Sequence, residues 1–175
     1  LSQLDGSIDG EDSGEEQLDA KTAQQIKSYL STHAKPYSSL QTVNGKLLRV
    51  FSFPSEFCLG SFYFPRVGIP SYTSVAAIGS VSLPATAALS FQCAASVKAY
   101  PDLLKYFRED ELSAIDLNEM RVLPLRVPAN LKRFTRLGRL ELKGTTLGAA
   151  DVEWLNELNS VRQLAVDDSH VPGAA

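Results

Sequence analysis

Oxygen-bearing side chains near the start of the chain follow the spacing of a calcium-binding loop. From Asp5 to Glu16, donors occupy positions 1, 3, 5, 9 and 12, and Gly10 occupies position 6, where such loops turn sharply. The donors are Asp5, Ser7, Asp9, Ser13 and Glu16. Only four residues precede Asp5, too few for an entering helix, and the normally apolar position 8 is Asp12. An acidic linker produces such a match readily, so we predict no metal site here.

Cysteine and histidine side chains, which often serve as nucleophiles and metal ligands, are few and dispersed. The chain has two of each, namely Cys58, Cys93, His33 and His170. No cysteine stands beside a base and no Gly-x-Ser-x-Gly turn is present, so no activated nucleophile is indicated. We expect free thiols in a reducing cytoplasm and histidines at the surface. We therefore predict a non-enzyme with no catalytic residue and no cofactor.

Charge is distributed unevenly along the chain. The net charge is −3 over 175 residues, but residues 1–20 hold seven acids and no base, so the remainder carries +4. Residues 121–143 hold seven bases and one acid, whereas residues 151–168 hold five acids and one base. A basic run can contact nucleic acid, but Phe134 is its only aromatic residue and is expected to be buried. We therefore expect charge complementarity between neighbouring segments and predict no nucleic-acid partner.

Residues 67–97 contain no charged side chain, which raises the question of a membrane span. Pro70, Pro84 and Gln92 interrupt this stretch, and large aliphatic residues are few within it. Segments 79–83 and 88–92 alternate small or polar with apolar residues, which is typical of strands. We predict two short strands here and no membrane span in the chain.

In the last third of the chain, a short pattern of apolar residues, here called a phrase, occurs three times. It predicts the strands and helices that position the charged residues of this region. Its three copies start 25 and then 24 residues apart. The copies are Leu112, Ile115, Leu117, Met120 and Val122; Leu137, Leu140, Leu142, Thr145 and Leu147; and Val161, Leu164, Val166, Ser169 and Val171. Between them lie helix-spaced apolar residues, Leu131 and Phe134 in the first gap and Val152, Leu155 and Leu158 in the second. A strand phrase and a helix phrase repeating at this period indicate stacked strand–helix units.

Alternation along each strand predicts one solvent-facing row of side chains. If the apolar positions point inward, the intervening residues of each copy point to the other side of the sheet. This predicted partner-binding face consists of Asp116, Asn118, Glu119, Arg139, Glu141, Lys143, Gln163, Asp167 and Asp168, with Ala114 and Ala165 between them. Stacking would align equivalent strands in parallel, with the helices on the opposite side.

The second copy carries a family resemblance. The segment from Leu137 to Leu147 resembles the leucine-rich repeat pattern L-x-x-L-x-L-x-x-N/C-x-L. Thr145 and Ser169 resemble the variant common in bacterial members, in which a small hydroxyl replaces the ladder asparagine, while Met120 departs from it. The resemblance covers residues 112–171 and implies a solenoid that binds protein partners.

The resemblance leads to a fold and domain prediction. We expect an α/β leucine-rich-repeat solenoid with parallel strands and convex helices, preceded by a β-rich lead-in and a disordered acidic N-terminus. The expected segments are a linker at 1–16, a helix and β-rich lead-in at 17–78, and a solenoid at 79–175. The solenoid would comprise a degenerate capping repeat at 79–111 and repeats at 112–136, 137–160 and 161–175, the last truncated.

The predicted function is a non-catalytic protein–protein interaction module located in the cytoplasm. The chain starts with Leu1 and stops soon after Val171, as a repeat opens, so we expect a fragment of a longer protein. Its layout is similar to bacterial proteins in which such repeats follow a Ser/Thr kinase domain, although no kinase motif is present. The alternatives are therefore a docking region of a multidomain enzyme whose catalytic domain lies outside this chain, and a structural spacer.

Overall fold

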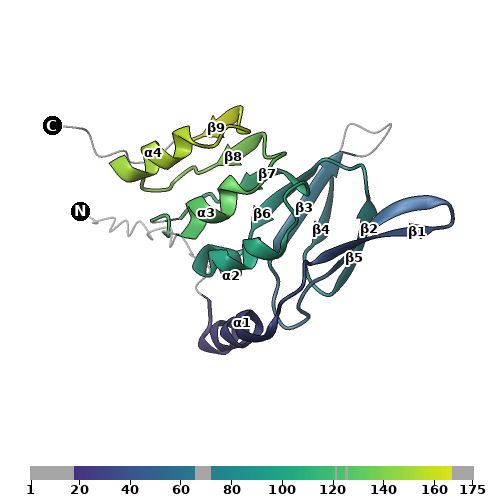
Figure 1. The fold of residues 1–175 in the computed structure, drawn as a ribbon. Helices are drawn as coiled ribbons and strands as arrows, with labels where there is room; N and C mark the ends of the chain where they lie inside the picture. Colours follow the sequence, from purple (N-terminus) through teal and green to yellow (C-terminus); the bar gives the residue numbers. More distant parts are fainter. Residues whose placement is uncertain (1–17, 66–71, 121, 125, 167–175) are drawn as a thin grey trace, which may run out of the picture.

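The computed structural model describes residues 18–65, 72–120, 122–124 and 126–166. Two sheets and several short helices make up this part of the chain (Figure 1). The helices are α1 (Ala20–Thr32), α2 (Ala95–Ala99), the 3₁₀ helix η1 (Pro101–Tyr106), α3 (Arg126–Lys132) and α4 (Ala149–Asn156). The strands are β1 (Ser38–Val43), β2 (Lys46–Ser52), β3 (Gly60–Pro65), β4 (Tyr72–Ala76), β5 (Ser80–Pro84), β6 (Leu89–Cys93), β7 (Leu112–Asp116), β8 (Arg139–Glu141) and β9 (Gln163–Ala165).

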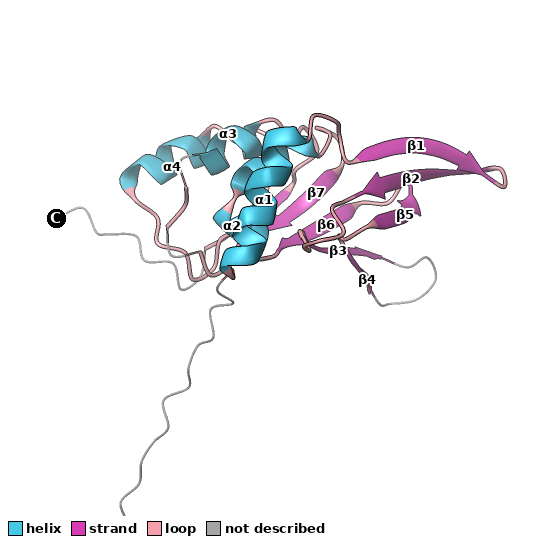
Figure 2. Cartoon of the chain, turned by 90° about the horizontal axis from the view of Figure 1, so that it is seen from below, coloured by secondary structure: helices cyan, strands magenta, loops and turns pink. Residues whose placement is uncertain are grey.

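The larger sheet is mixed and has the strand order β4-β3-β6-β7-β8-β9. Its first three strands are antiparallel, whereas β6, β7, β8 and β9 are parallel to one another. The smaller sheet, β1-β2-β5, is antiparallel throughout. Its β1–β2 hairpin turns at Asn44 and Gly45, both with positive φ, and projects away from the helices (Figure 2).

One apolar row runs across the whole larger sheet. Strand register places the following residues side by side, from β4 to β9: Val75, Phe62, Phe91, Ile115, Leu140 and Leu164. Phe62, Phe91, Ile115 and Leu140 are buried, while Leu164, on the last strand of this order, is 44% exposed. Full burial of one such side chain contributes about 1.5–3 kcal/mol, so this row supplies much of the stability of the sheet.

Helices α1 to α4 gather on one side of the larger sheet (Figures 1 and 2). The parallel connections require crossovers, and α2 with η1, α3 and α4 occupy them in turn. Their inward residues, among them Val97, Leu104, Leu131 and Trp154, join the same buried cluster as the strands. The opposite side of the sheet therefore lies away from these helices.

An aromatic cluster joins the smaller sheet to the larger one. Phe51 of β2 lies 5.1 Å from Phe62 of β3 between ring centroids, and Phe53 lies 5.8 Å from the same ring. Phe107, which follows η1, contacts Phe62 and Phe91 as well. Because Phe62 points to the helix-covered side, the smaller sheet packs on that side too.

A buried ion pair also ties the smaller sheet to the turn before β7. Arg49 of β2 lies with its Nη1 3.0 Å from Oε1 of Glu111, an ion pair without hydrogen-bond geometry, and its Nη2 lies 3.4 Å from Asp110. The Ser38 hydroxyl donates to Glu111, whose other oxygen accepts from the Arg108 backbone N–H at 2.8 Å. The Glu111 side chain is 0% exposed, so its charge depends on these partners.

The prediction of a solenoid is wrong. The described chain is a mixed α/β fold with two sheets, one antiparallel and one mixed. The three repeated phrases do supply parallel strands in equivalent register, with Ile115, Leu140 and Leu164 aligned. However, β7 also pairs with β6, and β6 pairs antiparallel with β3, so the repeats continue a sheet that the lead-in begins. In addition, β5, which falls in the expected capping repeat, belongs to the smaller sheet.

The uncharged stretch forms β4, β5, β6 and part of α2 where the structure describes it. Among the described residues, none of the helices has the length and apolar character required to cross a membrane.

Candidate functional site

Two rows of side chains cover the face of the larger sheet that the helices leave open. We call this surface the open face. From β4 to β9, the first row is Ser74, Tyr63, Ser90, Ala114, Arg139 and Gln163, and the second is Ala76, Ser61, Gln92, Asp116, Glu141 and Ala165. Every one of these residues is exposed or half-buried, whereas the apolar row between them is mostly buried. The open face is thus a polar surface that continues across both halves of the sheet.

Hydrogen bonds and an ion pair hold several side chains of the open face in place. The Tyr63 hydroxyl, on β3, lies 3.0 Å from the Gln92 side-chain oxygen on β6. On β8, Arg139 Nη2 lies 2.8 Å from Glu141 Oε1. The other Glu141 oxygen accepts from Asn118 Nδ2 at 3.3 Å. The first contact joins β3 to β6, the second lies within β8, and the third ties β8 to the turn after β7. Together they reduce the conformational freedom of these side chains.

Asn118 links the turns that follow β7 and β8. Its side-chain oxygen accepts from the Lys143 backbone N–H at 2.7 Å, and its own backbone N–H donates to Asp116 Oδ1 at 2.8 Å. Glu119 follows with a φ of 62° and donates its backbone N–H to the Lys143 carbonyl. The predicted residues Asn118, Glu119 and Lys143 therefore lie together at one end of the open face.

Thr145 occupies the ladder position of the second repeat. It is fully buried, and its hydroxyl donates to the Leu117 carbonyl of the preceding phrase at 3.4 Å. Met120 occupies the equivalent position of the first repeat and is 5% exposed. A hydroxyl can satisfy a buried carbonyl at this position, whereas a thioether can only fill space there.

Local electrostatics around Asp116 are unfavourable for its charge. Its half-buried position raises the pKa of this carboxyl above 3.8, and the charges of Glu141 and Glu119 raise it further. The hydrogen bond from the Asn118 N–H and the charge of Lys98 act in the opposite direction. This part of the open face therefore favours a neutralising positive group over another acid.

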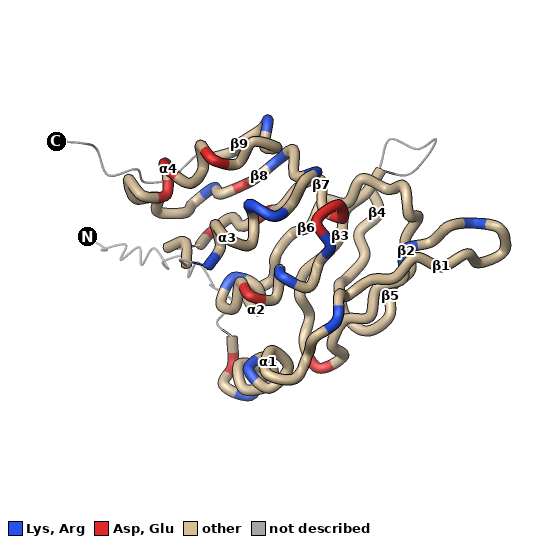
Figure 3. The backbone as a smooth tube through the Cα atoms, in the orientation of Figure 1, with Lys and Arg blue, Asp and Glu red and all other residues tan. Residues whose placement is uncertain are grey.

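The structure brings together most, though not all, of the predicted face. Asp116, Arg139, Glu141 and Gln163 project from neighbouring strands as expected. Asp167 and Asp168 lie outside the described residues, as do His170 and the calcium-like segment Asp5–Glu16. Strand β8 carries both signs of charge, whereas α4 carries acidic residues alone (Figure 3).

The sequence patterns do not reveal the half of the open face that β3, β4 and β6 provide. Tyr63 and Gln92 are its largest polar members and contact each other directly. The alternating segment 88–92 indicates a strand, but alternation alone does not reveal which strand pairs with it.

Comparisons with protein-family models, with curated proteins and with solved structures found no match. Within the described residues, no group of three or more His, Cys, Asp and Glu side chains could hold a metal ion.

The cysteines and the described histidine occupy protected positions. Cys93 is buried, and burial raises the pKa of its thiol, with the Asp116 carboxylate adding to the shift. A thiol of this kind is a poor nucleophile because the thiolate is disfavoured. His33 is half-buried rather than at the surface as expected, and its ring stacks on Tyr29 at 4.4 Å.

Proposed function

We propose that the chain is a protein–protein interaction module and that its open face binds the partner. The observation that carries this proposal is the unbroken pairing of two polar rows across six described strands. A surface of this extent offers many contact points on one rigid element, which lowers the ordering cost of binding.

The composition of the open face suits recognition of another protein. Tyr63 and Arg139 are of the residue types most enriched at protein interfaces. Asp116 and Glu141 place acidic groups beside Arg139, so the face combines both signs of charge over a short distance. Charges arranged in this way give specificity and correct orientation of the partner more than raw affinity.

A comparison of two charge reversals tests this proposal. Arg139→Glu is expected to reduce capture of the partner from cell extract at least about tenfold. The change removes a cation from the open face and places a second negative charge beside Glu141, so acidic groups of the partner would be repelled. Lys27→Glu makes the same change at an exposed position of α1 and should leave capture unaltered. Quantitative mass spectrometry of the captured proteins provides the measurement. Equal recovery with both variants would refute the role of the open face.

A further inference from the structure

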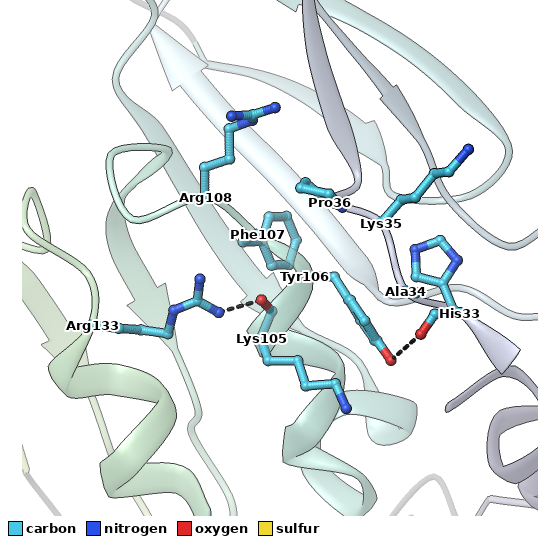
Figure 4. Close-up of a pocket in the computed structure, with 9 residues that line it drawn as sticks. All are labelled: His33, Ala34, Lys35, Pro36, Lys105, Tyr106, Phe107, Arg108 and Arg133. Carbon is cyan, nitrogen blue, oxygen red and sulfur yellow. Dashed lines mark hydrogen bonds between the residues drawn. The ribbon is translucent and has the colours of Figure 1, made fainter. Parts of the chain in front are cut away.

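A cavity of about 490 Å³ lies on the helix-covered side, between the end of α1, η1 and α3. Figure 4 shows its lining residues, which are His33, Ala34, Lys35, Pro36, Lys105, Tyr106, Phe107, Arg108 and Arg133. Three separate segments meet here, namely the α1–β1 connection, η1 with the turn after it, and the α3 region. The cavity is distinct from the open face.

Four cationic side chains surround this cavity, and no Asp or Glu is among its lining residues. Lys35, Lys105 and Arg108 are exposed, and Arg133 is half-buried. Among the described residues, none of these four side chains lies within ion-pair distance of a carboxylate. The cavity therefore concentrates positive charge that the fold does not neutralise by direct pairing.

The protein contacts of these cations are with neutral groups. Arg133 donates to the Lys105 carbonyl, and Arg108 donates through Nε and Nη2 to the Ser38 carbonyl at 3.3 Å each. The Lys105 ammonium lies 4.9 Å from the centre of the Tyr106 ring. Such contacts orient the side chains and leave their full charge available to a ligand.

Backbone and ring contacts hold the cavity walls together. The Tyr106 hydroxyl donates to the His33 carbonyl at 3.0 Å, and the Tyr37 N–H donates to the Tyr106 carbonyl at 2.9 Å. The His33 ring packs edge-on against Tyr106 at 4.7 Å. Because these contacts join the segments that line the cavity, little ordering should accompany binding.

We propose that this cavity binds the phosphate group of a phosphate monoester. A phosphate monoester carries nearly two negative charges at neutral pH and presents three acceptor oxygens. A carboxylate ligand has only one charge and two oxygens. Two guanidinium groups and two ammonium groups therefore match a phosphate dianion better than they match a carboxylate. Ala34, Pro36 and the Tyr106 ring add apolar wall for the group that carries the phosphate.

A nuclear magnetic resonance titration of the full chain tests the proposal at low ionic strength. The probes are inorganic phosphate, phenyl phosphate, and a short phosphoserine peptide with its unphosphorylated counterpart. We expect saturable shifts confined to residues 33–36, 105–108 and 133, with dissociation constants of about 1 mM or below. The unphosphorylated peptide should cause none of these shifts.

Two variants and a matched control locate the site. Lys105→Gln combined with Arg133→Gln should weaken binding at least about tenfold, because two charge-assisted contacts are removed. Lys35→Gln, at an exposed residue, provides a second variant that should fold normally and still bind less tightly. Lys46→Gln, at the start of β2 in the projecting hairpin, should bind like the wild type.

The outcomes separate the possible sources of the phosphate. Tighter binding of the phosphopeptide supports a phosphorylated polypeptide as the ligand, whereas equal or tighter binding of phenyl phosphate supports a small phosphorylated molecule. Dissociation constants above about 1 mM for all of the phosphate-bearing probes would overturn the proposal. Unchanged binding in both cavity variants would overturn it as well.

Discussion

The Arg49→Met variant is expected to lose about 3–5 kcal/mol of unfolding free energy. The Arg49 side chain is 8% exposed and lies 3.0 Å from Glu111, whose side chain is 0% exposed. Methionine replaces the hydrophobic stem of arginine but not its charge. The variant therefore leaves a carboxylate buried without its cation, which costs far more than the loss of an exposed ion pair. Equilibrium denaturation with urea provides the measurement.

Two further variants show whether burial of the charge is the cause. Arg49→Met combined with Glu111→Gln should recover most of the lost stability, because the isolated charge is then absent while the amide still offers polar atoms to Ser38 and to the Arg108 N–H. Arg126→Met removes the partner of Asp102 at a site where the arginine side chain is 74% exposed, so we expect a loss below about 1 kcal/mol. A similar loss in Arg49→Met and Arg126→Met would contradict the assignment of Arg49 as a buried link between the sheets.

Gly60→Ala is expected to destabilise the chain by more than about 3 kcal/mol, through both backbone strain and a steric clash. Gly60 begins β3 with a φ of +147°, a conformation that residues with a side chain rarely adopt. A Cβ atom at this position would lie 2.0 Å from the backbone oxygen of Gln92. Since Gly60 pairs with Cys93, the clash falls within the β3–β6 ladder that joins the two halves of the larger sheet.

Gly138→Ala provides the matched control because its geometry accepts a methyl group. A Cβ atom there would lie 3.8 Å from the Ser113 carbonyl, an ordinary contact, and its φ is not in the positive range. We expect the midpoint of thermal unfolding to fall steeply in Gly60→Ala and to stay close to the wild-type value in Gly138→Ala. Equal midpoints in the two variants would argue against the close β3–β6 approach.

The sequence was most informative where one short pattern repeats. The three phrases predict the strands β7, β8 and β9, and their shared spacing predicts that Ile115, Leu140 and Leu164 align. The Asn44–Gly45 pair predicts the β1–β2 turn, because both residues tolerate positive φ. For the turn, the information lies within the two residues themselves, and for the strands it lies in one short spacing that recurs after 25 and then 24 residues.

The sequence was least informative about pairing between distant segments. The solenoid prediction treated the repeats as a separate stack, but residues 60–63 and 90–93 pair across the gap between lead-in and repeats. No pattern in either segment specifies the other as its partner, since each indicates at most a strand. The same reason explains why Tyr63 and Gln92 were absent from the predicted face.

The cavity cations illustrate the same limit. Lys35, Lys105 and Arg133 are far apart in the sequence. The domain prediction places them in the lead-in, in the capping repeat and in the first full repeat, respectively. The sequence predicts that the basic run 121–143 complements the acidic segment 151–168. The structure pairs Lys132 with Glu157 of that neighbour, but Arg126 pairs with Asp102 of η1 and Arg133 lies beside a cavity.

Site-specific photo-crosslinking tests the role of the open face most directly. A benzophenone amino acid would replace Gln92 on β6 or Gln163 on β9 in the full chain, and Lys27 on α1 in the control. We predict that both open-face positions crosslink the same protein, that Arg139→Glu abolishes both crosslinks, and that position 27 does not capture that protein. Capture of that protein from position 27 alone, or crosslinks at positions 92 and 163 that persist in Arg139→Glu, would contradict the account.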